Sequence, residues 1–204
     1  MRLPSFLSKL ATTLGLPRSK RLFAGDDAMF KRTVRKDLVY AEYGCGASTI
    51  WVARHVGCRI LSVDTAKPWV ETVRKECVGV DGLSIHHCDL GPVGKWGRPV
   101  SYDKAAAFPE YTDWIWDQDV QPDVVLVDGR FRVCCFLTSL LRAREGTRIL
   151  FDDYTDRPHY QVVEQYLPRS ETDGRQALFV VPARDRLDVE GIRQAIERFR
   201  YVMD

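Results

Sequence analysis

Short apolar runs alternate with helix-like segments along most of this chain, and this alternation is the feature that most constrains its fold. Strands separated by helices of about ten residues form βαβ units, whose parallel sheet is covered by helices on both faces. The sequence therefore predicts an α/β fold with a doubly wound, mostly parallel sheet and an antiparallel last strand. The expected strands are residues 38–42, 58–64, 83–89, 123–128, 148–153 and 177–181, and the expected helices are residues 48–55, 69–77, 132–143, 159–167 and 189–202.

The length of 204 residues suits a single domain. We expect an N-terminal helical extension over 1–36, a core over 37–182 and a C-terminal helix over 183–204. Residues 91–121 form a long irregular connection, which in a compact domain is usually functional or locally helical. Apolar residues at helical spacing predict that the extension packs on the domain, with a membrane-surface or dimer helix as the alternative. These residues are Leu3, Phe6, Leu7, Leu10 and Leu14.

Charge and apolar content give no sign of a nucleic-acid or membrane partner. The 30 Lys and Arg against 28 Asp and Glu leave a net charge of +2. We find no run of 18 apolar residues, so the chain is expected to be soluble and cytoplasmic. Its 6 cysteines form no C-x-x-C pair and no zinc-site spacing, so they are expected to be buried free thiols in a reducing compartment.

Acidic residues end or directly follow the first five expected strands. They are Glu42, Asp64, Asp89, Asp128, Asp152 and Asp153. The carboxyl ends of parallel strands meet at one edge of a sheet, and ligands of open α/β sheets bind beyond that edge. The sequence therefore predicts an acid-rich binding site there.

A glycine-rich loop, Glu42-Tyr43-Gly44-Cys45-Gly46-Ala47-Ser48-Thr49, follows the first expected strand. Glycines let a backbone turn tightly and approach a ligand closely. The dinucleotide-binding fingerprint requires a third glycine where Thr49 stands, which disfavours a nicotinamide cofactor. A phosphate-binding P-loop is excluded, because the chain has no G-x-x-x-x-G-K-[ST] motif.

The pattern Glu42-x-Gly44-x-Gly46-x-Ser48-Thr49 resembles motif I of the class I S-adenosylmethionine-dependent methyltransferases. The resemblance extends over about residues 37–181. It implies that the chain is an enzyme of this class and that S-adenosylmethionine is its cofactor. Gly44 and Gly46 would lie at the methionine part of the cofactor, Glu42 would help to hold its amino group, and Ser48 would also belong to the cofactor site.

The same resemblance assigns roles to the acids that follow the next strands. Asp64 would bind the ribose hydroxyls, for which a carboxylate is a suitable acceptor. Asp89 would face the adenine amino group, with Leu90 beside the ring. Asp128 would bear on the sulfonium or on the methyl acceptor. The cationic sulfonium also suits an acid-rich edge.

The acids after the fourth and fifth strands allow two readings. Their layout is similar to that of the metal-dependent catechol-type O-methyltransferases, which would make Asp128, Asp152 and Asp153 ligands of a divalent cation. However, Arg130 and Arg132 stand in the following loop, and either arginine can neutralise these acids without a metal. A metal is therefore compatible with the sequence but is not expected.

The residues that would handle the acceptor are less well marked, because methyl transfer mainly requires alignment of the reacting atoms. We expect Asp128 and His159 to act in catalysis, with His159 as a general base. The predicted substrate contacts are Arg130, Asp153 and Tyr154. The Asn-Pro-Pro-aromatic signature of many amino-N-methyltransferases is absent. This favours a small-molecule acceptor, with a hydroxyl group as the methylated position.

Two other functions remain open at this point. The aromatic stretch 108–116 also suits a non-catalytic module that binds a cofactor or a protein partner, because tyrosine and tryptophan are favoured interface anchors. A nicotinamide-dependent dehydrogenase on the same sheet is a weaker alternative. The acceptor and the oligomeric state are not determined by the sequence.

Overall fold

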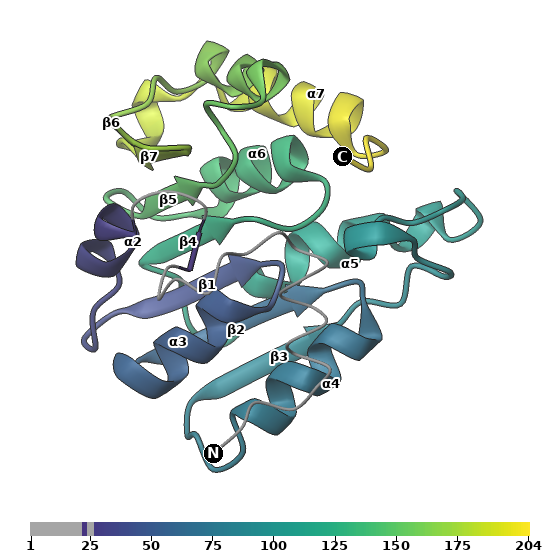
Figure 1. The fold of residues 1–204 in the computed structure, drawn as a ribbon. Coiled ribbons are helices and arrows are strands. Elements are labelled where there is room, and N and C mark those ends of the chain that lie inside the picture. The colour runs from purple at the N-terminus through teal and green to yellow at the C-terminus, as the bar shows by residue number, and fades with distance from the viewer. Residues whose placement is uncertain (1–21, 24–26) are drawn as a thin grey trace.

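The structure is a computed structural model that describes residues 22–23 and 27–204. Its centre is a seven-stranded sheet in the order β3-β2-β1-β4-β5-β7-β6 (Figure 1). The first five strands are parallel, whereas β7 runs antiparallel to β5 and to β6. The strands are β1 (Val39–Tyr43), β2 (Arg59–Asp64), β3 (Leu83–His87), β4 (Val124–Val127), β5 (Arg148–Phe151), β6 (Glu171–Asp173) and β7 (Gln176–Val180). The predicted fold class is confirmed, including the antiparallel last strand.

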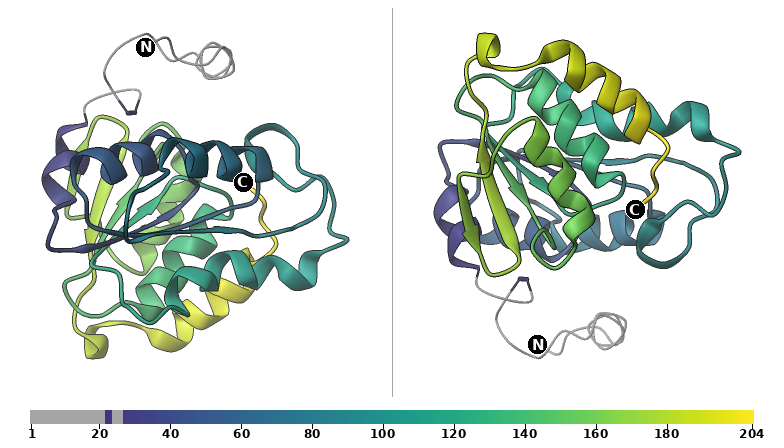
Figure 2. Two further views of the ribbon diagram at one scale, coloured as in Figure 1. Left: turned by 90° about the horizontal axis from the view of Figure 1, so that it is seen from below. Right: turned by 90° about the horizontal axis from the view of Figure 1, so that it is seen from above.

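Helices cover both faces of the sheet, so that the molecule has three layers (Figure 2). One face carries α2 (Ala28–Thr33), α3 (Ala47–His55) and α4 (Lys67–Glu76). The other face carries α5 (Phe108–Asp113), α6 (Arg132–Arg142), the 3₁₀ helix η4 (Pro158–Gln165) and α7 (Val189–Phe199).

The sheet has a hydrophobic core on each face. Successive residues of the central strands belong to the two cores alternately, because side chains of a strand point to opposite faces. In β4, Val124 and Leu126 belong to the α3 side, while Val125 and Val127 belong to the α6 side. All four side chains are fully buried. This double burial explains why the sequence of β4 is continuously apolar.

The long connection 91–121 folds into short helical pieces. They are η1 (Lys95–Gly97), η2 (Ala105–Ala107), α5 and η3 (Trp114–Trp116). The rings of Phe108, Tyr111 and Trp116 are buried in the domain itself. These three rings therefore cannot be the exposed interface anchors on which the non-catalytic reading depended.

Two elements differ from the sequence prediction. Strand β6 was not predicted, because Glu171–Asp173 contains only polar residues and lies at the edge of the sheet. The helix expected over 159–167 is the 3₁₀ helix η4, which begins at Pro158. The short 3₁₀ helix η5 (Arg184–Arg186) precedes α7.

The cysteine prediction is confirmed, since all 6 cysteines are buried and free. Among the described residues, we find no helix with the length and hydrophobicity needed to cross a membrane. The apolar stripe from Leu3 to Leu14 lies outside the described residues.

Candidate active site

The loops that follow β1 and β4 meet at the carboxyl edge of the sheet. Gly44 adopts a φ of +95°, and a Cβ atom there would lie 2.8 Å from the Cα of Gly129. A Cβ atom on Gly129 would in turn overlap the hydroxyl of Tyr111. Glycine is therefore needed at both positions for this close approach of the two loops.

Glu42 is fully buried beneath the first loop and binds hydroxyl groups of its neighbours. Its carboxylate accepts hydrogen bonds from Tyr40 (2.8 Å), Ser48 (2.7 Å), Ser62 (2.9 Å) and Thr49. Burial raises the pKa of Glu42, while the hydroxyl hydrogen bonds oppose this rise.

The hydroxyl contacts of Glu42 explain two residues of the first loop. Thr49 Oγ1 also accepts a hydrogen bond from the Gly46 backbone N–H at 2.8 Å, which fixes the start of α3. Ser48, predicted at the cofactor, is buried and donates its hydroxyl to Glu42. In the structure, the side chains of Glu42 and Ser48 stabilise the first loop through their hydrogen bonds. Their direct contact with a cofactor remains a prediction.

Asp64, at the end of β2, braces the first loop from the other side. Its Oδ2 accepts the Cys45 N–H at 2.9 Å, and its Oδ1 accepts the Ala66 N–H at 2.7 Å. Burial raises the pKa of this carboxyl, although the two backbone hydrogen bonds oppose the rise. An ionised carboxylate has about four acceptor positions, and the two N–H groups and the Cys45 side chain leave one of them for a ligand hydroxyl. This chemistry fits the predicted ribose contact.

Gly46 provides the clearest sign that the first loop approaches a ligand. Its φ of 173° is an extended conformation that any residue adopts. No described atom lies within 4 Å of where its Cβ would stand, apart from its own chain neighbours. The fold itself therefore does not require glycine here, and the missing side chain leaves space above the loop. Gly46 and Asp64 together fit the methionine and ribose parts of S-adenosylmethionine.

The predicted adenine-side residues lie at the end of β3. Asp89 has 64% of its side chain exposed and pairs with Lys104 Nζ at 2.6 Å. This pairing lowers the pKa of Asp89. Leu90 is buried. Asp89 is thus open to a ligand at the surface, and its role toward adenine stays a prediction.

The acids after β4 and β5 form one cluster, in which an oxygen of each of Asp128, Asp152 and Asp153 lies within 4.8 Å of the others. The same acids are bound by arginines. Arg132, only 3% exposed, pairs with Asp128 at 3.0 Å and with Asp153 at 3.3 Å. Arg175 pairs with Asp152 and with Asp153 at 3.0 Å, and Arg157 pairs with Asp153 at 2.8 Å.

These arginines determine how the cluster compares with a metal site. Three carboxylates with oxygens this close match the ligands of a hard divalent cation. Here, however, three guanidinium groups already neutralise them, and Asp152 is fully buried with a further hydrogen bond from Gln176 at 2.9 Å. A divalent cation would lie directly against guanidinium groups of like charge, so the residues do not fit a resident metal. Of the two arginines expected to neutralise the acids, Arg132 does so.

Asp128 keeps one oxygen free at the edge of the sheet. Its side chain is 30% exposed, and Oδ1 pairs with Arg132. Among the described residues, Oδ2 has no hydrogen bond or ion pair. Burial and the charge of Asp152 raise the pKa of Asp128 to about 8, against the opposing effect of Arg132. A carboxylate with a pKa near the working pH can exchange a proton with a substrate.

Arg130 differs from its neighbours, because its guanidinium makes no hydrogen bond or ion pair with the described residues. Its Nε atom is buried without a partner. Its backbone N–H donates to the hydroxyl of Tyr111 at 3.1 Å. Burial, followed by the charge of Arg132, lowers the pKa of Arg130. The predicted substrate contact of Arg130 is thus geometrically open.

The remaining predicted acceptor residues are placed differently. His159 is exposed at the start of η4, with its ring centroid 4.3 Å from that of Tyr160. No interaction within the described chain connects His159 to Asp128 or Asp153. Tyr154 is fully buried and donates its hydroxyl to Glu164 at 2.7 Å, so the structure does not support the predicted substrate contact.

Sequence reasoning missed several residues of this edge. Arg157 lies four positions after Asp153, a spacing that could have indicated the pair. Arg175 lies between β6 and β7, and its contact depends on strand pairing that the sequence did not reveal. Asp204 Oδ1 accepts the backbone N–H of Arg132 at 3.1 Å. Nothing in the local pattern around Asp204 marks it as part of the site.

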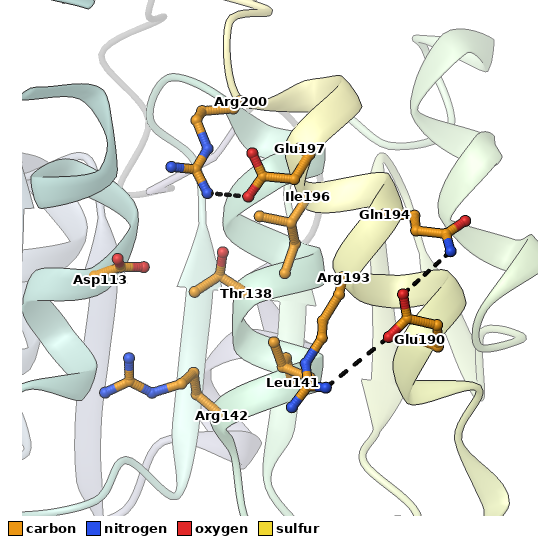
Figure 3. Close-up of a pocket in the computed structure, with 10 residues that line it drawn as sticks. All are labelled: Asp113, Thr138, Leu141, Arg142, Glu190, Arg193, Gln194, Ile196, Glu197 and Arg200. Atoms are coloured by element: carbon orange, nitrogen blue, oxygen red, sulfur yellow. Dashed lines mark hydrogen bonds and ion pairs between the residues drawn. The ribbon is translucent and has the colours of Figure 1, made fainter. Parts of the chain in front are cut away.

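A separate hollow of about 380 Å³ lies between α6 and α7 (Figure 3). None of the residues at the strand ends lines it. Its Arg200 pairs with Glu197, and its Arg193 lies 4.0 Å from Glu190. Thr138 Oγ1 and Arg200 Nε, also in this lining, are buried without a hydrogen-bond partner in the described chain.

Comparisons with known proteins agree with the fold. A methyltransferase-like protein from Silicibacter pomeroyi is 31% identical to this chain, covers 92% of it and 99% of its own length, and superposes with a TM-score of 0.77. Cofactor-bound Rv0187 from MTB is 18% identical over 89% of this chain and 91% of its own, with a TM-score of 0.52. An O-methyltransferase from Bacillus cereus in complex with SAH is 14% identical over 89% and 92%, with a TM-score of 0.50. The last two comparisons show a similarity of fold alone.

No family model matches this chain, and no curated protein matches it. The Silicibacter likeness nevertheless extends over nearly the full length of both chains. The chain belongs to the class I S-adenosylmethionine-dependent methyltransferase family. The fold, enzyme class and cofactor expected from the sequence are confirmed at the level of this family.

Proposed function

We propose that this protein transfers the methyl group of S-adenosylmethionine to a hydroxyl group of a small-molecule acceptor at the edge formed by β1, β2, β4 and β5. The observation that carries the proposal is the contact of Gly44 with Gly129, which joins the cofactor loop to the loop holding Asp128 and Arg130. A ligand above Gly46 and an acceptor beside Asp128 would then be neighbours.

The chain's own residues would divide the work as follows. When bound, the cofactor supplies an activated methyl group on a positively charged sulfur. Asp64 would hold the ribose hydroxyls, and the backbone of Gly44 to Gly46 would hold the amino-acid part. Transfer to the acceptor oxygen would leave the electrons of the carbon–sulfur bond on sulfur, so that S-adenosylhomocysteine would be the leaving group. Asp128 Oδ2, in its ionised form, would accept the hydroxyl proton.

A hydroxyl acceptor is supported by the placement of Asp128. Its raised pKa and free Oδ2 suit removal of a proton from oxygen. A small molecule is supported by the balance of charge at this edge, where the arginines are matched by acids rather than gathered into a basic surface. A basic surface would be needed to hold a nucleic-acid backbone.

The cofactor part is tested by calorimetry with S-adenosylhomocysteine. We expect binding by the wild type and at least about tenfold weaker binding by Asp64→Ala, since the ribose contact is lost. The exposed Asp37→Ala variant is the control and should bind normally. Failure of the wild type to bind would contradict the proposal.

The transfer part is tested with methyl-labelled cofactor and a panel of hydroxyl, amine and RNA acceptors. We expect label on a hydroxyl compound and a loss of about 10²- to 10⁴-fold in kcat for Asp128→Asn, the usual effect of removing a general base. Label on RNA or on amines would contradict the acceptor assignment. Binding without any transfer would favour a non-catalytic module instead.

A further inference from the structure

The arginines at the carboxyl edge divide into two kinds. Arg132, Arg157 and Arg175 each form ion pairs with the aspartates that follow β4 and β5. Arg130 forms no ion pair with any described residue, and its buried Nε donates no hydrogen bond. A guanidinium keeps its charge at all physiological pH values, and buried polar groups are almost always paired. Arg130 is therefore the one described arginine of this edge whose charge is left for an external group.

The surroundings of Arg130 fix its backbone and leave its charged end without a partner. Its N–H is held by the Tyr111 hydroxyl, and the preceding Gly129 is pressed against Gly44. The rings of Tyr111 and Tyr160 lie near enough to interact electrostatically with the guanidinium. Both rings are buried in the domain, so packing holds them in place beside Arg130.

A carboxylate of the protein itself lies in the same neighbourhood. Asp204 reaches the first residue of α6 and accepts the N–H of Arg132. The C-terminal segment runs past the loops at the carboxyl end of the strands in both views of Figure 2. Burial raises the pKa of Asp204, while the N–H of Arg132 and the charges of Arg132, Arg130 and His159 oppose this rise. Asp204 and Arg130 are nevertheless not within ion-pair distance of each other.

We propose that Arg130 binds a carboxylate group of the methyl acceptor, so that the acceptor is a hydroxy acid. A guanidinium presents paired N–H donors that match the two oxygens of a carboxylate. The charges of Arg132 and Arg130 both act on the Asp204 carboxylate, so the guanidinium of Arg130 reaches a carboxylate from this position. The proposal rests on the proposed function and names the substrate class for the same site.

The neighbours of Arg130 favour the acceptor over the cofactor as the source of this carboxylate. Of the groups that interact with the charge of Arg130, Tyr160, Arg132 and Asp204 lie on the β4–β5 side of the edge, and Asp64 lies on the β1–β2 side. The space above Gly46 and the hydroxyl-binding Asp64 lie on the β1–β2 side. A cofactor bound by Gly46 and Asp64 would leave Arg130 to the second ligand.

The binding test uses benzoate and its uncharged counterpart benzamide as probes. Both are titrated by NMR into the full chain saturated with S-adenosylhomocysteine. We expect benzoate to bind at least about tenfold more tightly than benzamide, and Arg130→Gln to abolish this difference while Arg130→Lys restores part of it. Arg186→Gln, an exposed arginine beyond β7, is the control and should behave as the wild type.

Each alternative outcome is informative. Equal binding of benzoate and benzamide, or unchanged benzoate binding by Arg130→Gln, would overturn the proposal. Weaker binding of S-adenosylhomocysteine by Arg130→Gln, with benzoate unaffected, would assign the guanidinium to the cofactor and also overturn it. Failure of S-adenosylhomocysteine to bind the wild type concerns the proposed function alone, and the benzoate titration of the free protein still decides this proposal.

Enzyme turnover provides a second test, again by comparing a carboxylate compound with its uncharged amide. With labelled cofactor, 3-hydroxybenzoate should be methylated with a lower KM than 3-hydroxybenzamide. Arg130→Gln should raise the KM for the acid at least about tenfold and leave kcat within about threefold, because the residue binds the acceptor and does not touch the reacting atoms. A loss confined to kcat would contradict this role.

Discussion

The two halves of the carboxyl edge stabilise their acids in different ways. On the β1–β2 side, Glu42 is satisfied by four hydroxyl groups and Asp64 by two backbone N–H groups. On the β4–β5 side, Asp152 and Asp153 are satisfied by guanidinium groups. Neutral donors leave the negative charge of the acids in place, whereas arginines cancel it.

This difference suits two ligands of opposite charge. An edge that stays negative favours the cationic sulfonium of S-adenosylmethionine. On the β4–β5 side, arginines neutralise the charge of the acids, and the guanidinium of Arg130 is unpaired. This side therefore favours an anionic group. On the proposed function, a chain with a net charge of only +2 would thus hold two ligands of opposite charge side by side.

The strongest test of the comparison is Arg132→Gln. Arg132 is 3% exposed, pairs with two aspartates and donates to the backbone oxygens of Gly129 and Asp152. Removing one partner of a buried ion pair leaves the acids uncompensated, so we expect a loss of about 3–5 kcal/mol in the free energy of unfolding. Urea denaturation measures this loss.

Arg144→Gln is the matched control for this test. Arg144 pairs with Asp123, but its side chain is 59% exposed. We expect a loss of less than about 1 kcal/mol, as for other surface pairs. Equal losses for the two variants would show that the β4–β5 acids do not depend on their arginines.

A smaller effect is expected for Gly46→Ala on the β1–β2 side. The backbone of Gly46 is extended and no described atom would meet the new methyl group, so stability should change by less than about 0.5 kcal/mol. The methyl group would occupy the space left for the ligand. We expect at least about tenfold weaker binding of S-adenosylhomocysteine by calorimetry, about 1.4 kcal/mol.

Gly57→Ala should show the reverse pattern. Gly57 has a φ of +68°, which costs a residue with a side chain about 1–2 kcal/mol. It lies after the far end of α3, so cofactor affinity should stay unchanged. Normal affinity in Gly46→Ala would mean that the space above this loop is not used by the cofactor.

The smallest expected effect concerns the pH dependence of Glu42→Gln. Burial raises the pKa of Glu42 above its ordinary value of 4.5, so the wild type loses stability as the pH rises from this value through the raised one. The amide cannot ionise and is free of this loss. The cost of the substitution, about 1 kcal/mol for altered hydrogen bonds, should therefore shrink as the pH rises.

Unfolding free energies of both proteins between about pH 4.5 and 8 measure this difference. Contributions from Asp64 and Asp128 are common to wild type and variant and cancel in the comparison. A cost that grows with pH would mean that the ionised form of Glu42 is the one that the hydroxyls stabilise.

The sequence was sufficient to predict the parallel strands and the acids at their ends. Their signal is local, because a doubly buried strand such as Val124–Val127 must be apolar throughout. The glycine loop was equally readable, since only Cys45 separates Gly44 from Gly46 in the chain. These features are set by the order of residues within a few positions.

The partners of the acids could not be predicted in the same way. Arg175 reaches Asp152 only because β7 pairs with β5, and the polar strand β6 gives no apolar signal. The burial of Tyr154 likewise depends on its packing against Phe151 and Phe179. Contacts across many positions depend on the tertiary arrangement, which no local pattern contains.

The position of Arg175 also has a consequence for the order of folding. The arginine follows Asp152 by 23 positions and is carried by the β6–β7 hairpin, so it cannot bind Asp152 until the hairpin has docked on β5. Pairing of distant strands is slow, because a loop must be closed before its contacts form. We infer that a chain with only its parallel strands assembled still bears an uncompensated Asp152, since Arg175 and Gln176 both come with the hairpin, whereas Asp128 and Asp153 already have Arg132 and Arg157. Completion of the sheet and neutralisation of Asp152 are thus one event.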